Sequence, residues 1–280
     1  MGALFALASA GLYGIADFAG GLLARRAGFA AVALIGQVAG LLAMAATAPF
    51  LLVGAPSLTD LGWGALSGVG SGVGMVFLYR GMSAGQMSVV VPVSAVGSVA
   101  LPVLVAVLLL GERPSAIAWL GIALAIPALW FVSRSRRTTG PAVTTGVAHA
   151  LVASVGFAVQ YAALAQAARG SGIWPVVAGR LAATCTILSF VMATHALATL
   201  RMAPREWAGS ALTGAVAAWA LVFYLLATRE DIMTIAVVLS SLYPVIPAVL
   251  GIAVLRERLS LLQSLGLVAA IAAIGLLTAA

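Results

Sequence analysis

The chain has 280 residues, of which 63% are hydrophobic and only 8% are charged. A soluble domain cannot bury that much apolar surface, so the composition indicates that lipid surrounds most of the chain. The formal net charge is +7, and all 14 basic residues are arginines. These arginines are spread over the connections between apolar stretches and form no basic stripe, so we expect no nucleic-acid partner.

Apolar stretches of the roughly 20 residues that cross a bilayer as a helix follow one another from the N-terminus. The first has no positively charged segment before it, so we expect a membrane span there and not a cleaved signal peptide. The sequence thus predicts an all-α integral membrane protein with ten transmembrane helices. The predicted spans are residues 2–23, 29–53, 59–82, 86–110, 115–133, 142–168, 172–195, 205–228, 232–255 and 260–279.

The second half of the chain repeats features of the first at an offset of 145 residues. The matched pairs are Pro102 with Pro247, Glu112 with Glu257, Arg113 with Arg258, Gly121 with Gly266, Tyr79 with Tyr224 and Gly11 with Gly156. Matches in one register indicate a duplicated unit, with repeats over residues 1–135 and 142–280. Five helices per repeat is an odd number, so the second copy must cross the membrane in the opposite direction, as in the inverted repeats of secondary transporters.

The arginines in the connections predict the orientation of the chain. Ten of them fall on one side of the membrane, namely Arg25, Arg26, Arg80, Arg134, Arg136, Arg137, Arg201, Arg205, Arg256 and Arg258. The other side has only Arg113, Arg169 and Arg229. Because an excess of arginine marks the cytoplasmic loops, we expect both termini outside.

The fourth and ninth predicted helices, which correspond across the repeats, each carry two prolines. These are Pro92, Pro102, Pro244 and Pro247. Proline removes a backbone donor and frees the carbonyl four residues earlier, so we expect kinks and exposed polar groups along the wall of a central cavity. The residues expected on this wall are Ser94, Ser98, Ser240 and Tyr243. The alternative is that the prolines only bend the helices.

Two ionisable residues lie inside predicted spans, where charge is costly and marks candidate functional sites. Asp17 lies about 10 Å from the cytoplasmic end of its helix and Arg180 about 12 Å from the outer end of its own. We expect both to face the interior, as a pair or as separate contacts for a substrate or a proton; a purely structural ion pair is the alternative. Further cavity candidates are Tyr13, Tyr79, Gln160, Trp219 and Tyr224, with Gln37, Tyr161 and Trp174 nearby.

Some polar features favour a structural interpretation. Tyr79 and Tyr224 would belong to the interfacial aromatic belt if they do not face a cavity. Glycines at every fourth residue of the third helix, such as Gly64 and Gly68, are typical of close helix packing. The charged turns at 111–113 and 256–258 lie at membrane ends, where we expect a glutamate beside arginine to cap a helix or pair across a loop.

Catalytic and metal-binding patterns are absent from the sequence. It contains no H-E-x-x-H or G-x-S-x-G motif, and Asp17 has no second acid nearby that could form a dyad. His149 and His195 are isolated, without a second ligand at helical spacing. We therefore expect no enzyme, no metal and no cofactor.

The ends of the two copies resemble the repeat signature of the EamA family, in the drug/metabolite transporter superfamily. The stretches are LLLGERPSAIAWLGIAL at 108–124 and VLRERLSLLQSLGLV at 254–268, and LYGIADFAGG at 12–21 is similar to the first helix of bacterial members. The second copy departs from the first with Arg256 in place of Gly111. The resemblance implies a ten-helix inverted-repeat exporter of small metabolites in a bacterial-type plasma (inner) membrane.

These features together predict a secondary transporter that exports small polar or amphipathic metabolites, such as amino acids, by alternating access through a central cavity. The expected partners are a small-molecule substrate, the lipid bilayer and, as a candidate coupling ion, the proton. Proton antiport through Asp17 and diffusion without an ion are both open, as are a monomer and a homodimer. The alternative is a lipid or isoprenoid-phosphate flippase of the same fold, in which Arg180 would meet a phosphate.

Overall fold

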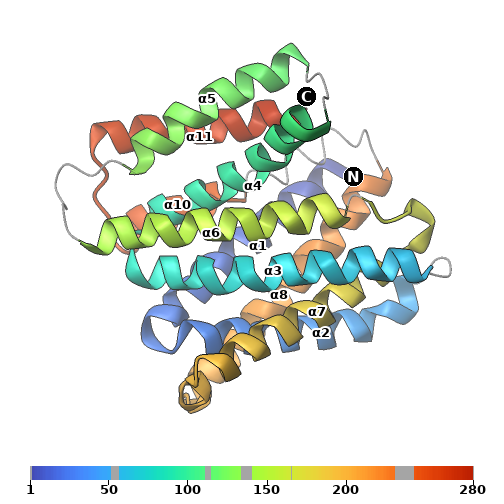
Figure 1. The fold of residues 1–280 in the computed structure, drawn as a ribbon. Coiled ribbons are helices and arrows are strands. Elements are labelled where there is room, and N and C mark those ends of the chain that lie inside the picture. Colours follow the sequence, from blue (N-terminus) through green and yellow to red (C-terminus); the bar gives the residue numbers. More distant parts are fainter. Residues whose placement is uncertain are drawn as a thin grey trace.

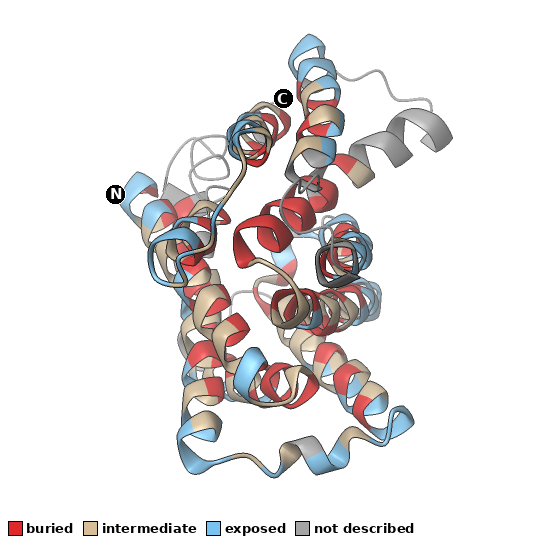
Figure 2. Cartoon of the chain, turned by 90° about the vertical axis from the view of Figure 1, so that its left-hand side faces the viewer, coloured by how far each residue is buried: buried red, intermediate tan, exposed pale blue. Residues whose placement is uncertain are grey.

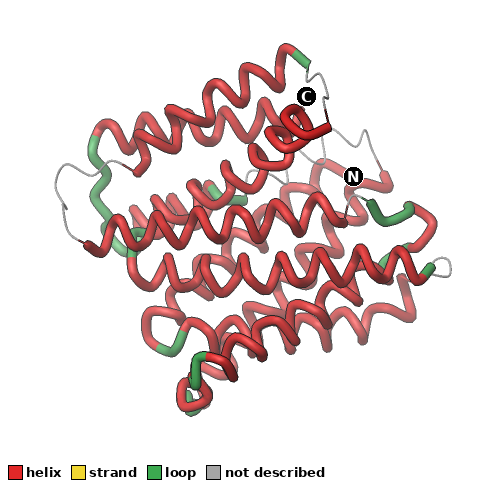
Figure 3. Tube along the Cα trace, in the orientation of Figure 1, coloured by secondary structure: helices red, strands yellow, loops and turns green. Residues whose placement is uncertain are grey.

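The computed structural model of the chain describes residues 2–51, 57–110, 115–133, 141–164, 166–230 and 243–279. All regular structure in these ranges is helical (Figures 1 and 3). The α-helices (α) and short 3-10 helices (η) are α1 (Gly2–Arg26), α2 (Phe29–Leu51), α3 (Leu58–Ala84), α4 (Met87–Leu110), α5 (Ala116–Ser133), α6 (Pro141–Leu164), η1 (Arg169–Ser171), α7 (Trp174–Ala193), η2 (Ala196–Leu200), α8 (Pro204–Glu230), α10 (Val245–Ala253) and α11 (Leu261–Ala279).

Six helices of the described chain are long and apolar enough to cross a membrane. They cover Gly2–Arg26, Phe29–Thr47, Leu58–Ala84, Thr145–Leu164, Trp174–Ala193 and Pro204–Phe223. Shorter apolar helical stretches lie within α4, α5 and α11. The helix bounds lie within a few residues of the predicted spans, because the apolar stretches of the sequence end where the helices end.

The ninth predicted span differs from the observed structure. Tyr243 and Pro244 form a turn, and α10 begins only at Val245, so residues 243–255 are not part of one continuous helix. Pro244 is the N-cap of α10, and Pro247 lies in its first turn. Proline fits both places, because the first N–H groups of a helix have no acceptor within the helix. Residues 231–242, with Ser240, lie outside the described residues.

The helices pack as a layered bundle around α3 and α8 (Figure 1). The first of these two helices lies against α6 and α7, and the second lies against α1 and α2. At the other side of the bundle α5 packs on α11, and α4 lies between α6, α10 and α11. Buried residues line the sides of the helices that face one another (Figure 2). Helix α1 begins, and α11 ends, at the same end of the bundle (Figure 1).

Glycines let several of these helices meet at backbone distance. A Cβ atom at Gly68 would overlap the carbonyl of Gly179, where α3 crosses α7, and one at Gly214 would overlap the carbonyl of Gly36, where α8 crosses α2. The packing role predicted for the glycines of the third helix is confirmed, because only a residue without a side chain allows so close an approach. Van der Waals contact at these crossings stabilises the bundle in lipid, where the hydrophobic effect between helices is absent.

We expect Gly68→Ala to lower the melting temperature of the detergent-solubilised protein, at a cost of about 1–3 kcal/mol for overpacking. Gly62→Ala is the matched control, because Gly62 is in the same helix and nothing lies within 4 Å of a Cβ added there. Alanine favours a helix over glycine by about 1 kcal/mol, so the control should melt at the same temperature or higher. Equal shifts in the two variants would contradict the packing role of Gly68.

Candidate functional site

An acid and a tyrosine lie together in the interior of the bundle. Asp17 on α1 is 9% exposed and Tyr79 on α3 is 5% exposed. The Tyr79 hydroxyl lies against α1 at Gly20, where the missing side chain leaves room for the ring. The charges of Asp17 and Arg180 both act on this hydroxyl. Tyr79 therefore lies within electrostatic range of both ionisable groups, and its burial places it in the interior and not in an interfacial belt.

Arg180 on α7 reaches across to α2. It is half-buried, and its Nη1 donates a hydrogen bond of 3.0 Å to Oε1 of Gln37, which is 3% exposed. A Cβ atom at Gly40, one turn further along α2, would lie 3.2 Å from the same Nη1. Arg180 thus bonds to Gln37 and not to Asp17, so the acid and the base are separate groups in this structure.

Three tyrosines extend the polar group toward α10. The rings of Tyr13 and Tyr243 have centroids 6.1 Å apart, and the side chain of Tyr243 forms a hydrogen bond with Tyr161 of α6. The charge of Asp17 also acts on Tyr243. Tyr243, in the turn before α10, therefore lies next to α1 and α6.

The serines predicted for the cavity wall are bonded within their own helix. Ser94 and Ser98 are each 2% exposed, and their hydroxyls donate to the carbonyls of Val91 (2.9 Å) and Ala95 (2.8 Å). Ser154 of α6, which the sequence analysis did not single out, donates to carbonyls of α4 and of its own helix. Only the Ser154 hydroxyl joins two helices, and a water-filled path along Ser94 and Ser98 stays a prediction.

Pro92 of α4 and Pro244 at the start of α10 line the same small hollow, of about 10 Å³, with apolar residues of α10 and α11. This volume is about that of one water probe, so prolines from the two corresponding helices line the same narrow gap. A larger hollow of about 190 Å³ lies elsewhere, between the start of α2 and the end of α7.

The remaining predicted residues are less closely associated with this interior group. Gln160 of α6 has a buried Oε1 atom without a hydrogen-bond partner in the described structure. Trp219 of α8 is 48% exposed. The side chains of Tyr224, Ser240 and Pro102 lie outside the described residues.

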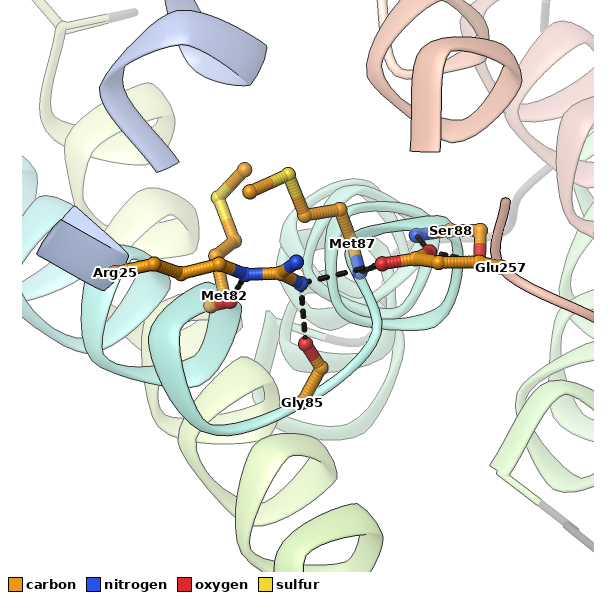
Figure 4. A network of polar contacts seen from close by, with 6 residues as sticks. All are labelled: Arg25, Met82, Gly85, Met87, Ser88 and Glu257. Carbon is orange, nitrogen blue, oxygen red and sulfur yellow. Dashed lines mark hydrogen bonds and ion pairs between the residues drawn. The ribbon is translucent and has the colours of Figure 1, made fainter. Parts of the chain in front are cut away.

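A second polar network lies at one end of the bundle and joins its two halves (Figure 4). Glu257, in the segment after α10, accepts hydrogen bonds from the backbone N–H groups of Met87 and Ser88, both 3.0 Å, and from the Ser88 hydroxyl at 2.6 Å. These are the first N–H groups of α4, which have no acceptor within the helix. A carboxylate there also interacts favourably with the helix dipole.

Arg25, at the end of α1, completes this network. Its Nη2 bonds to Glu257 at 3.1 Å and to the carbonyl of Gly85 at 2.7 Å, and its Nε donates to the carbonyl of Met82 at 2.8 Å (Figure 4). The Glu257 side chain is 8% exposed. The structural role predicted for the turn at 256–258 is confirmed for Glu257, and the turn at 111–113 lies outside the described residues.

The backbone at Arg256 turns Glu257 toward α4. Arg256 has a φ of 54°, in the left-handed region that favours glycine. The corresponding residue of the first copy is Gly111, so the departure between the copies falls on a position with a special backbone requirement. Gly251 also lacks the Cβ atom that would stand 2.8 Å from Glu257 Oε2.

The sequence predicts Gln37 and Tyr161 only as residues near the cavity, without naming the side chains that they contact. The structure makes them the bonded partners of Arg180 and Tyr243. Gln37 could be found from the sequence because a single amide in an apolar span needs a polar partner. Arg25 lies at a span end with other arginines, and nothing in the sequence distinguishes it as the partner of Glu257.

The family model of the EamA-like transporters matches residues 1–134 and 144–279 of the chain. No curated protein matches it. A crystal structure of a protein that is 19% identical superposes with a TM-score of 0.57, covering 98% of this chain and 95% of that chain. Identity this low supports a likeness of fold and no more.

We expect Glu257→Ala to lower the free energy of unfolding by about 2 kcal/mol or more, because it leaves the start of α4 and the Arg25 guanidinium without their acceptor. Glu206→Ala is the matched control: Glu206 accepts a single exposed bond from the Ala203 N–H at the start of α8. Loss of such a cap costs about 1 kcal/mol. Thermal unfolding in detergent measures both variants, and a larger loss at Glu206 would contradict the role of Glu257.

Proposed function

The chain belongs to the EamA-like transporter family, and from this premise we propose that it is a secondary transporter that exports small polar or amphipathic metabolites, amino-acid-like solutes among them, by alternating access. The family and the apolar helices make it a multi-pass membrane protein of the drug/metabolite transporter type. The substrate class is inferred from the polar interior of the bundle, and export from the resemblance to the metabolite exporters of the family.

The interior group of Asp17, Tyr79 and Arg180 is the observation that carries the proposal. Ionisable groups inside a membrane bundle are costly, and those that line a transport path repay this cost by binding polar solutes. Asp17 and Arg180 bond to no common partner among the described residues, and Tyr79, on a third helix, lies within electrostatic range of both. A polar solute that crosses the bundle would find an acceptor, a donor and an aromatic hydroxyl from three helices there.

The packing of the two halves supports ten spans arranged as inverted repeats. The offset of 145 residues carries α3 onto α8, α6 onto α1 and α7 onto α2. The contacts of α3 with α6 and α7 therefore correspond to the contacts of α8 with α1 and α2. The two segments that match the family model also fall on the two predicted repeats. Transporters with such repeats bind substrate between them, near the middle of the membrane.

The network of Arg25 and Glu257 holds together helices that would have to separate during alternating access. It lies on the arginine-rich side, which is the cytoplasmic side in the proposed orientation. It ties the end of α1 to the start of α4 and to the segment after α10. In the proposed orientation, loading a substrate from the cytoplasm would require these three segments to separate.

We expect purified protein in liposomes to catalyse saturable movement of at least one amino-acid-like solute, and the same solute to raise the melting temperature of the protein. A ligand at 100 times its Kd stabilises a protein by about 2.7 kcal/mol. Tyr79→Phe should weaken the apparent affinity for that solute, while Trp219→Phe, on an exposed side chain, should not.

Fluorescent lipid phosphates serve as the competing substrates in the same liposomes. If they alone are moved, and no soluble metabolite is, the protein is a flippase and the proposed exporter is wrong. Normal transport of a soluble solute by Tyr79→Phe would remove Tyr79 from the binding site without affecting the family assignment.

We expect Asp17→Asn to abolish the response of transport to a proton gradient, because Asp17 is the buried acid of the interior group. Asparagine has nearly the same shape, so the bundle should remain folded. Asp60→Asn is the matched control: Asp60 is equally buried, but it caps α3 and bonds to the Ala168 N–H at the end of the bundle. If Asp17→Asn responds to the gradient as the wild type does, Asp17 is not the proton acceptor.

A further inference from the structure

The guanidinium of Arg180 has an incomplete set of partners. Its hydrogen bond, of 3.0 Å, goes to the neutral amide of Gln37. No carboxylate of the described residues lies within ion-pair distance of it, whereas Arg25 has both a carboxylate and two carbonyls. An arginine offers five N–H donors in a planar fork, and one amide oxygen accepts from only one of them.

The place of Arg180 makes this incompleteness costly. The side chain is half-buried between helices of a membrane bundle, where an uncompensated charge is destabilising by several kcal/mol. A retained charge in such a place indicates that a counter-ion arrives during function. The planar fork of arginine matches carboxylate and phosphate oxygens in two parallel hydrogen bonds.

The surroundings of Arg180 are shaped to hold the guanidinium in place. Gln37 is 3% exposed, so its amide has little freedom to leave the bond with Nη1. Gly40 presents no side chain to the guanidinium, which therefore lies close to the backbone of α2 beside the carbonyl of Gly214 in α8. Contact with α2 thus occupies one N–H of the fork, and the other donors have no hydrogen-bond partner among the described residues.

Resting on the proposed function, we propose that the transported solute carries an anionic oxygen group, a carboxylate or a phosphate, which binds Arg180 in the interior of the bundle. Gln37 is a positioning residue: it holds one N–H of the fork and acts on the solute through Arg180. A neutral amide does this without competing for the charge, which a glutamate at the same place would do.

The test is Gln37→Glu, which places a fixed carboxylate beside the guanidinium with almost no change in shape. Gln263→Glu is the matched control, because Gln263 is 2% exposed and accepts a backbone hydrogen bond at the start of α11, away from Arg180. The probes are the L-amino acids and their methyl esters, succinate, inorganic phosphate and geranyl phosphate. Melting temperature reports binding, and liposome flux reports transport.

We expect Gln37→Glu to weaken binding of the anionic probe that stabilises the wild type by on the order of 30-fold, as for loss of one partner of a buried charge pair. Binding of a neutral methyl ester should change little, and Gln263→Glu should bind both as the wild type does. Arg180→Gln should show the same selective loss, with Arg180→Lys in between. Selective loss for an amino acid or succinate identifies a soluble carboxylate, and selective loss for geranyl phosphate identifies a lipid phosphate.

Two results overturn the inference: no anionic probe stabilises the wild type, or Gln37→Glu affects acid and ester equally. A different result would contradict the proposed function: selective binding of an anion at Arg180 without flux of any probe. Flux that is insensitive to Gln37→Glu keeps the transporter and removes the anion site.

Discussion

A carboxylate from the second half of the chain caps the start of a helix in the first half, and the arrangement of the bundle depends on this contact. The opening N–H groups of α4 have no acceptor in their own helix, and a buried donor without an acceptor is costly. Glu257 meets them, and Arg25 balances its charge. Because α4 packs on α6, α10 and α11, fixing its start also fixes the contact between the halves.

The two best-defined arginines of the bundle show opposite uses of the same side chain. Arg25 is 27% exposed and bonds to a carboxylate and two carbonyls, so its charge is balanced within the protein. Arg180 is held by one amide beside a glycine of α2. A charge that is paired with a carboxylate stabilises one arrangement of helices, whereas a charge without a counter-ion can bind and release a ligand.

Much of the architecture could be predicted because lipid imposes simple rules. Apolar length predicted most of the helices within a few residues, the glycine spacing predicted close packing of α3, and the position of Glu257 at a membrane end predicted a structural role. The break before α10 was missed, since two prolines close together in an apolar run permit both a bent helix and a restarted one. Trp219 is 48% exposed, and its place in the cavity stays a prediction, because sequence alone does not determine which side of a helix faces lipid.

The sequence by itself determined the lipid environment, the helical class, the repeated unit and the presence of an acid and a base at membrane depth, because composition and periodicity are local properties of the chain. Only the tertiary structure decided which groups meet. Arg180 bonds to Gln37, 143 residues away, and Arg25 to Glu257, 232 residues away. Partners at such separations depend on how helices cross, and crossing is set by small contacts such as Gly214 on Gly36, which leave no distinct signal in the residues they bring together.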